Sequence, residues 1–259
     1  MSRLEEVFSE QRPVLVAYLC AGDPTPTQSL PLFRALIEGG ADVVEIGVPF
    51  SDPGADGPAI QQASERALAA GTSLDDALDL AAQLEGAAKV LFGYLNPFMA
   101  YGYERLAKRC AKAGIDGLLC VDCPPEEEPE LREALLAHGV HPILLIAPTT
   151  PDDRVAAIAP TASGFVYYVS MNGVTGAALN VDDALVRRID RVRGLAGLPV
   201  AVGFGVARPE DAAALGRVAD GVVVGSALVR IVAEHGGGAE EPLRALVREL
   251  KGAMRSPEV

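Results

Sequence analysis

The sequence predicts an α/β protein that folds as a (β/α)8 (TIM) barrel, and three observations lead to this fold class. Short apolar runs alternate with segments of helical spacing along the whole chain. The runs are apolar throughout, which is typical of parallel strands covered on both faces of a sheet. Eight such strand–helix units fit within the 259 residues, the usual size of such a barrel.

Eight runs rich in Val, Ile, Leu and Ala are the predicted strands, and a helical segment follows each of them. The strands are predicted at residues 14–19, 43–48, 90–95, 117–121, 143–147, 164–169, 200–202 and 221–224. The helices are predicted at residues 27–37, 74–84, 103–113, 126–137, 152–158, 182–192, 209–215 and 227–233. Turn and capping residues open several of them, as Pro151-Asp152-Asp153 does. Extra helices are predicted at the N-terminus (5–10), after strand 2 (60–69) and at the C-terminus (242–250).

An open, doubly wound sheet is the alternative architecture for this pattern. That fold usually carries a G-x-G-x-x-G turn after its first strand, but this chain reads Ala21-Gly22-Asp23-Pro24 there. No linker or change in composition divides the chain, because the glycine run at 236–238 only separates the last two helices. We therefore expect residues 1–259 to form a single barrel domain.

Acidic residues outnumber basic ones, since 22 Lys and Arg stand against 35 Asp and Glu and the formal net charge is −13. This balance argues against nucleic acid or an anionic membrane as the main partner. Hydrophobic residues make up 49% of the chain, which is enough for a large core. The sequence has no run of about 18 apolar residues and no basic patch before an apolar N-terminal segment. We expect a soluble, cytoplasmic protein.

Four cysteines, Cys20, Cys110, Cys120 and Cys123, are too few for a disulfide framework in a chain of this length. Cys120 and Cys123 form a C-x-x-C motif, which can bind zinc, cycle as a redox pair or simply be two buried thiols. A zinc site needs two further ligands, and the sequence has no second C-x-x-C and no H-x-x-x-H. We therefore expect reduced thiols at a strand end and no bound metal.

Glu45 interrupts the otherwise apolar run 43–48. In a barrel, reactive groups come from the C-terminal ends of strands and from the loops that follow them. A buried carboxylate without a partner is costly and tends to take up a proton, so its pKa rises. Pairing with a buried cation is the alternative, but no Lys or Arg stands at the C-terminal end of a predicted strand. We therefore predict that Glu45 is a functional acid.

The loop after this strand, residues 49–58, is rich in Pro, Gly and Asp. These residues suit turns, and a long loop at this place also suits a lid over the site. Glycine-containing turns follow strands 6, 7 and 8, where barrels commonly bind phosphate through backbone N–H groups and a helix N-terminus. The turns are Gly173-Val174-Thr175-Gly176, Gly203-Phe204-Gly205 and Gly225-Ser226. Together they predict a phosphate site.

The positions of the lysines and histidines narrow the chemistry. Lys89, Lys108, Lys112 and Lys251 fall in predicted helices or at a strand start, which argues against a Schiff-base mechanism. The three histidines flank the entrance of strand 5 or follow the last barrel helix. Metal-assisted and histidine-based mechanisms thus lack their usual groups. Carboxylate acid–base chemistry on a small phosphorylated molecule remains.

Over essentially its whole length, the sequence resembles the α subunit of tryptophan synthase. The signature is VEIGVPFSDP at residues 44–53, followed by ADGPAIQ at residues 55–61. Supporting matches are Gly22-Asp23-Pro24, Tyr94 with Asn96-Pro97, Asp122 before Pro124, Ser170 with Gly173-Val174-Thr175-Gly176, and Gly203-Phe204-Gly205. The resemblance implies a (β/α)8 barrel that cleaves indole-3-glycerol phosphate into indole and glyceraldehyde 3-phosphate, a retro-aldol reaction.

The resemblance also implies roles for individual residues. Glu45 would protonate the indole carbon that carries the side chain and help to deprotonate the adjacent hydroxyl. Asp56 would hold the indole N–H and stabilise positive charge on the ring. These two roles need a protonated Glu45 and an ionised Asp56, and two carboxyl groups in different environments can have such different pKa values. Tyr167 would orient Glu45 or the ligand, and Thr175 would meet Asp56 when two loops close. The residues implied for phosphate binding are Gly176, Gly205, Gly225 and Ser226.

A partner is implied as well: a pyridoxal-phosphate-containing β subunit, joined in an αββα assembly with an internal tunnel for indole. Asp52, Pro53, Asn96 and Pro97 would lie on the partner-facing loops, and this chain would bind no cofactor itself. Two alternatives stay open, a stand-alone lyase that releases indole without a β subunit and a barrel kept mainly as an allosteric binding module.

Two residues depart from the family pattern. Gly54 replaces a bulkier apolar residue, which predicts a more mobile loop. Cys20 stands where Thr is common at the end of strand 1, which predicts a weaker hydrogen bond.

Overall fold

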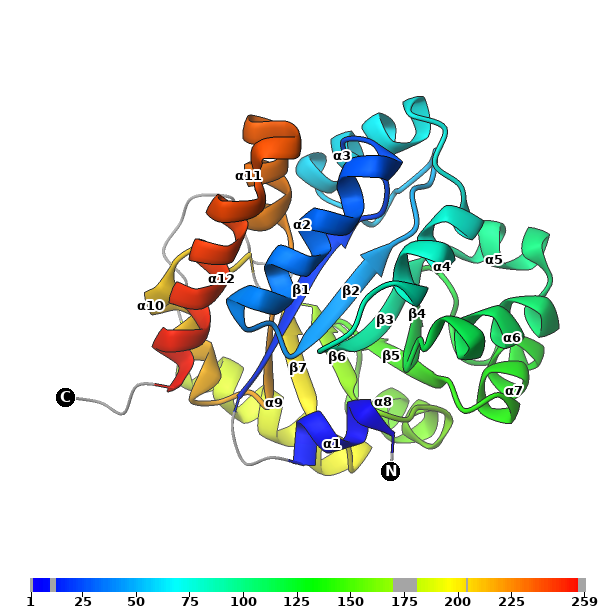
Figure 1. The fold of residues 1–259 in the computed structure, drawn as a ribbon. Coiled ribbons are helices and arrows are strands. Elements are labelled where there is room, and N and C mark those ends of the chain that lie inside the picture. Colours follow the sequence, from blue (N-terminus) through cyan, green and yellow to red (C-terminus); the bar gives the residue numbers. More distant parts are fainter. Residues whose placement is uncertain (1, 10–12, 170–180, 204, 256–259) are drawn as a thin grey trace.

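Eight parallel strands close into a barrel in the computed structural model, which describes residues 2–9, 13–169, 181–203 and 205–255. Each strand pairs with the next one along the chain, and β8 pairs with β1 to close the ring (Figure 1). Helices surround the strands on the outside. The predicted (β/α)8 fold class is confirmed, and the alternative of an open sheet is excluded.

The strand and helix bounds follow the predicted alternation. The strands are β1 (Val14–Cys20), β2 (Val43–Gly47), β3 (Ala88–Gly93), β4 (Gly117–Cys120), β5 (His141–Ile146), β6 (Val166–Val169), β7 (Val200–Gly203) and β8 (Gly221–Val224). The helices are α1 (Arg3–Ser9), α2 (Pro26–Gly39), α3 (Pro58–Ala69), α4 (Leu74–Ala82), α5 (Leu95–Tyr101), α6 (Tyr103–Ala113), α7 (Pro129–Ala137), α8 (Asp152–Ile158), α9 (Asp183–Ala196), α10 (Pro209–Gly216), α11 (Ser226–His235) and α12 (Glu240–Arg255). Short 3-10 turns follow α8 (η1, Ala159–Thr161) and α11 (η2, Gly236–Gly238). The extra helices predicted at the N-terminus, after strand 2 and at the C-terminus are confirmed as α1, α3 and α12.

One predicted strand is displaced, because β3 begins and ends two residues before the predicted range 90–95. The strand takes in Lys89, whose ammonium group donates hydrogen bonds to the carbonyl oxygens of Ala81, Leu84 and Ala113 at 2.8 to 3.2 Å. A charged side chain can therefore be accommodated inside this apolar layer. Leu95, which the sequence analysis places in the strand, instead begins α5, a short helix that was not predicted.

Three aspartates, each just before a strand, bind the N-terminal end of the neighbouring strand. Asp42 accepts a hydrogen bond from the N–H of Leu15 at 2.8 Å. Asp116 accepts one from Lys89 N at 2.8 Å, and Asp220 accepts one from Val200 N at 2.7 Å. Each carboxylate satisfies a backbone donor at the start of the adjacent strand, which sets the register of β1–β2, β3–β4 and β7–β8.

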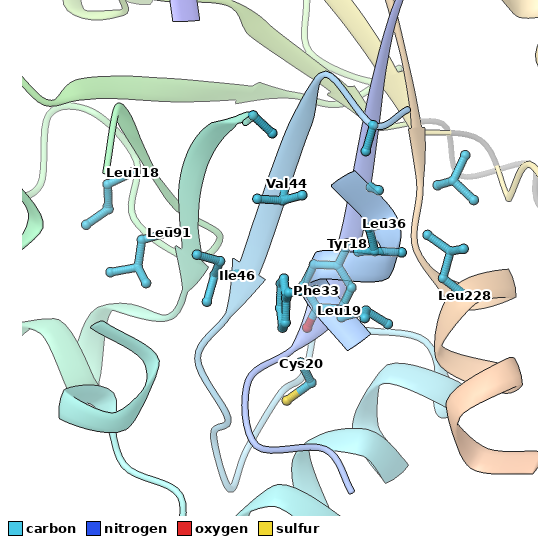
Figure 2. Packing of buried hydrophobic residues seen from close by; sticks show 14 of the residues in the cluster. Tyr18, Leu19, Cys20, Phe33, Leu36, Val44, Ile46, Leu91, Leu118 and Leu228 are labelled. Carbon is cyan, nitrogen blue, oxygen red and sulfur yellow. The ribbon is translucent and has the colours of Figure 1, made fainter. Parts of the chain in front are cut away.

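The barrel has an inner core of inward-pointing side chains and an outer core between the strands and the helices. The inner core includes Val16, Val43 and Val90, which share a face because side chains alternate along each strand. The outer core is larger, and Figure 2 shows Phe33 and Leu36 of α2 beside β1 and β2. These layers position the ends of the strands rigidly.

The N-terminal end of the barrel is closed by α1 (Figure 1). Leu4 is fully buried in the inner core, and the ring of Phe8 lies 5.0 Å from that of Phe165. Because α1 fills this end with apolar side chains, we expect the active site at the opposite end, where the strands have their C-termini.

Replacing Leu4 with Ala should lower the free energy of unfolding by about 2–5 kcal/mol, because the change leaves a cavity in the inner core. The measurement is a urea unfolding curve of the full chain. Leu136 is 46% exposed on α7, so Leu136→Ala is the matched control and should cost less than about 1 kcal/mol. Equal losses in the two variants would contradict the role of α1 as a plug.

Candidate active site

Glu45 points into the barrel from β2, where it lies between Tyr18 of β1 and Val90 of β3 in the strand register. Its side chain is buried, with the residue only 1% exposed, and neither carboxylate oxygen has a hydrogen-bond partner among the described residues. Burial raises the pKa of Glu45 to about 8. The carboxyl group is therefore protonated at neutral pH, and no described cation pairs with it.

Asp56 lies in the loop between β2 and α3 and is half-buried. The hydroxyl of Tyr94 donates a hydrogen bond to Asp56 Oδ2 at 2.9 Å, and Gln61 Nε2 donates one to the carbonyl oxygen of Asp56 at 2.8 Å. Burial raises the pKa of Asp56 to about 6, against the opposing effect of the Tyr94 hydrogen bond. At neutral pH one carboxyl group is thus protonated and the other is ionised, as acid–base pairs in active sites require.

Glu45 and Asp56 both raise the pKa of the same two tyrosines, Tyr18 and Tyr167, so the two carboxyl groups share electrostatic neighbours. Burial raises the pKa of Tyr167, and the charges of Glu45 and Asp56 raise it further. Burial likewise raises the pKa of Tyr18, again with contributions from both carboxylates. Tyr18 comes from β1 and Tyr167 from β6, so the site lies within the ring of strands.

Glycines on neighbouring strands make room for these two hydroxyls. A Cβ atom on Gly47 would lie 2.2 Å from the hydroxyl oxygen of Tyr18. One on Gly203 would lie 2.7 Å from that of Tyr167. Both distances are shorter than a real Cβ contact, so a larger residue at either position would force the tyrosine ring to move. No described hydrogen bond joins Tyr167 to Glu45, so an orienting role for Tyr167 toward the ligand stays a prediction.

The structure describes only part of the predicted phosphate site. Gly225 precedes α11 and Ser226 is its first residue. A Cβ on Gly225 would lie 3.5 Å from the Tyr18 side chain, so this helix begins beside the site. Gly205 is exposed with a φ of 69°, which only glycine adopts readily. Thr175 and Gly176 lie outside the described residues. The first N–H groups of a helix lack partners within that helix, which suits an anion.

The four residues predicted to face a partner lie on two adjacent segments. Asp52 and Pro53 are in the β2–α3 loop, and Asn96 and Pro97 are in the first turn of α5. Asp52 and Asn96 are exposed. The hydroxyl of Tyr94, the residue before α5, accepts a hydrogen bond from the N–H of Ala55 at 3.2 Å and so joins the two segments. The structure therefore brings all four residues to one side of the site.

Tyr94 and Asp122 are site-adjacent residues to which the sequence analysis assigns no role. The N–H of Leu95 donates a hydrogen bond to Asp122 Oδ1 at 2.8 Å, which ties α5 to the loop after β4. Both residues are among the supporting matches to the family, and that was the available signal. The partners in these two hydrogen bonds lie 27 and 38 positions apart in the chain, so no local pattern could reveal the contacts.

The C-x-x-C cysteines lie beside a different cavity. Cys120 and Cys123 are half-buried free thiols at the end of β4. They line a cavity of about 500 Å³ between α7 and α8, whose walls include Leu118, Leu131 and Leu144. Neither Glu45 nor Asp56 lines it, so we do not place the substrate there. Among the described residues, no group of three or more His, Cys, Asp or Glu side chains is arranged to hold a metal.

The two departures from the family pattern have different surroundings. Gly54 is exposed, and a Cβ there would have no atom within 4 Å, so this place would also accept a larger residue. Cys20 is buried, its Sγ lies 3.9 Å from Ser64 Oγ, and burial raises its pKa to about 12. The Cys20 thiol is therefore neutral at physiological pH.

Known proteins resemble this chain over nearly its whole length. A family model described as tryptophan synthase alpha chain matches residues 4–256. The tryptophan synthase alpha chain of Novosphingobium aromaticivorans is 48% identical over 99% of this chain and 98% of its own length. That of Rhizorhabdus wittichii is 49% identical over 98% of this chain and 97% of its own length.

Solved structures show the same similarity. The crystal structure of tryptophan synthase subunit alpha from Legionella pneumophila superposes with a TM-score of 0.90 at 36% identity, covering 98% of both chains. The structure of Mycobacterium tuberculosis tryptophan synthase superposes with a TM-score of 0.91 at 38% identity, covering 99% of both chains.

Proposed function

This chain belongs to the tryptophan synthase alpha chain family, and we propose that Glu45 and Asp56 perform the family's reaction in it as a proton donor and an ionised carboxylate. The chain is a carbon–carbon lyase of tryptophan biosynthesis that cleaves indole-3-glycerol phosphate into indole and glyceraldehyde 3-phosphate. Residues 1–259 act in this reaction as a single domain, which the closure of the barrel by β8 and β1 supports.

The reaction begins with transfer of the Glu45 proton to the ring carbon that carries the glycerol phosphate chain. Positive charge then develops on the indole ring, and the Asp56 carboxylate stabilises it while accepting a hydrogen bond from the ring N–H. Glu45, now ionised, removes the proton of the adjacent hydroxyl. The carbon–carbon bond breaks, its electron pair returns to the ring, the hydroxyl carbon becomes the aldehyde, and Glu45 is again protonated.

The phosphate group of the substrate binds at the glycine turns and at the start of α11. Gly205, Gly225 and Ser226 offer backbone N–H groups there, and we assign Gly176 to the same phosphate site and Thr175 to contact with Asp56. Uncharged donors of this kind bind phosphate despite the net charge of −13. Tyr167 orients the ligand between this phosphate site and the two carboxyl groups.

The partner of this chain is the β subunit of tryptophan synthase, and this chain itself carries no cofactor, because pyridoxal phosphate belongs to the β subunit. We propose an αββα assembly in which Asp52, Pro53, Asn96 and Pro97 contact that subunit. We also place the reaction in the cytoplasm, which the unpaired thiols of the C-x-x-C motif support. No described helix is both long enough and apolar enough to cross a membrane.

The observation that carries the proposal is the buried Glu45 carboxyl group, which has no described partner. The test is to follow indole release from indole-3-glycerol phosphate by the purified chain, alone and with the β subunit. We expect indole and glyceraldehyde 3-phosphate in equal amounts, and faster release with the β subunit present. Equal rates in the two assays would favour the stand-alone lyase, and no cleavage in either would favour a binding module.

The pH profile of kcat/KM should be bell-shaped. Asp56 must be ionised, and its pKa is raised to about 6, so activity falls as the pH drops through that value. Glu45 must be protonated, and its pKa is raised to about 8, so activity falls as the pH rises through that value. Initial rates at limiting substrate between pH 5 and 10 provide the test. A profile that is flat through this range would contradict the assignment of the two carboxyl groups.

A further inference from the structure

We propose that Tyr94 is a positioning residue, which holds Asp56 in its reactive orientation and connects it to the partner-facing first turn of α5. This inference rests on the proposed function, because it concerns the residue that controls Asp56 in the same reaction. The Tyr94 hydroxyl contacts Asp56 and Ala55, so we assign it a role that acts through Asp56.

One hydroxyl fixes both the side chain and the backbone of the Asp56 loop. It donates to Asp56 Oδ2 at 2.9 Å and accepts from the N–H of Ala55 at 3.2 Å. The Tyr94 ring stacks on that of Phe50 with the ring centres 5.2 Å apart, and Tyr94 is only 4% exposed. A buried, stacked ring has little freedom, so the position of its hydroxyl is set by the backbone of Tyr94.

The backbone of Tyr94 is in turn held at the start of α5. Tyr94 is the N-cap residue of this helix, in an extended conformation, and Leu95 is the first helical residue. The hydrogen bond from Leu95 N to Asp122 Oδ1, at 2.8 Å, anchors this point to the loop after β4. Asn96 and Pro97 follow directly. A partner that contacts these two residues thus presses on the segment that carries the Tyr94 ring, and a shift there moves Asp56.

The surroundings of Asp56 make the Tyr94 hydroxyl important for the ionisation of the Asp56 carboxyl group. Among the described residues, Tyr18, Cys20 and Tyr167 interact electrostatically with Asp56. Arg66 is the described cation in this region, since it also acts on Cys20, but its guanidinium group pairs with Asp23 at 2.7 Å. No described cation forms an ion pair with Asp56. Burial raises the pKa of Asp56, and the Tyr94 hydrogen bond is the interaction that opposes it. Removing the hydroxyl should therefore both release the carboxylate and favour its protonated form.

The test is Tyr94→Phe in the full chain, assayed alone and with the β subunit. We expect kcat to fall by about 10- to 100-fold, the size expected for losing a hydrogen bond to a charged group. The acid limb of the pH profile should move to higher pH, and stimulation of cleavage by the β subunit should shrink. Binding of glycerol 3-phosphate, used as a probe of the phosphate site, should stay the same and shows that the variant is folded.

Tyr101→Phe is the matched control. Tyr101 ends the same helix, and its hydroxyl donates to Asp75 Oδ1 at 2.5 Å, away from the site. This variant loses the same group from a tyrosine–aspartate pair but should keep kcat within about twofold of the unmodified chain, because the hydroxyl of the half-buried Tyr101 contacts neither Asp56 nor its loop. Equal kcat and equal acid limbs in Tyr94→Phe and Tyr101→Phe would overturn the proposal.

A measurement without turnover separates this inference from the proposed function. The pKa of Asp56, followed by NMR of the labelled carboxyl carbon, should be higher in Tyr94→Phe than in the unmodified chain and in Tyr101→Phe. If the unmodified chain did not cleave indole-3-glycerol phosphate, the proposed function would fail while this comparison still tested the role of Tyr94. An unchanged Asp56 pKa would refute that role whatever the activity.

Discussion

Glu45→Gln should lower kcat for indole-3-glycerol phosphate cleavage by on the order of 10² to 10⁴ while leaving the affinity for a phosphate ligand nearly unchanged. Glutamine has the shape of the protonated carboxyl group but cannot give its proton to carbon. The phosphate site is formed by other elements, including the start of α11, so binding there should not change. The measurement is steady-state kinetics of the variant, together with titration of glycerol 3-phosphate.

The same variant provides its own control for folding. Glu45 makes no hydrogen bond with the described residues, so replacing it removes no stabilising contact, and burying a neutral amide in its place should leave the unfolding midpoint close to that of the unmodified chain. Whatever activity remains should also lose the basic limb of the pH profile near the Glu45 pKa of about 8. Near-normal turnover would refute the assignment of Glu45 as the acid.

Asp56→Asn should lower kcat by about 10²- to 10³-fold, the usual cost of removing one preorganised group that stabilises transition-state charge. Asparagine can still accept the hydrogen bond from Tyr94 through its amide oxygen, so the loop should stay in place while the negative charge is lost. The effect should appear in kcat more than in the affinity for glycerol 3-phosphate, because the charge acts on the ring rather than on the phosphate.

Glu65→Gln is the matched control for this prediction. Glu65 lies on α3, the helix that follows the Asp56 loop, and its side chain is exposed. The substitution removes one negative charge from the same region and should change kcat by less than about twofold, since exposed charges interact weakly across solvent. Similar losses in Asp56→Asn and Glu65→Gln would mean that net charge, and not the position of Asp56, controls the rate.

The fold could be predicted from the sequence because its signals are local. The bounds of α8 and β8 agree with the predicted ranges, since Pro151 and Asp152 mark the start of one and a run of three valines forms the other. The start of β3 could not be predicted in the same way. Lys89 is tolerated in that strand because its ammonium group donates hydrogen bonds to carbonyl oxygens at the C-terminal ends of α4 and α6. Only the packing of these two helices against β3 brings those oxygens together.

The roles of the three site residues could be predicted from the sequence to different extents. Glu45 stands out by elementary chemistry, as a lone carboxyl group in a buried strand. Asp56 does not, because an Asp in a loop of Pro and Gly equally suits a turn, and only the family resemblance singled it out. Tyr94 received no role because it falls within the predicted apolar strand 90–95, where a tyrosine equally suits the core. Its function depends on a hydroxyl contact across 38 positions of the chain.

The pKa of Glu45 tests the account most directly. The full chain, labelled at the carboxyl carbons of glutamate, can be titrated by NMR, with Glu45→Gln used to assign the resonance. A buried proton donor should titrate near pH 8, the value to which burial raises its pKa. Titration near the ordinary value of about 4.3 for glutamate would mean that this carboxyl group is ionised when substrate arrives, and would contradict the mechanism.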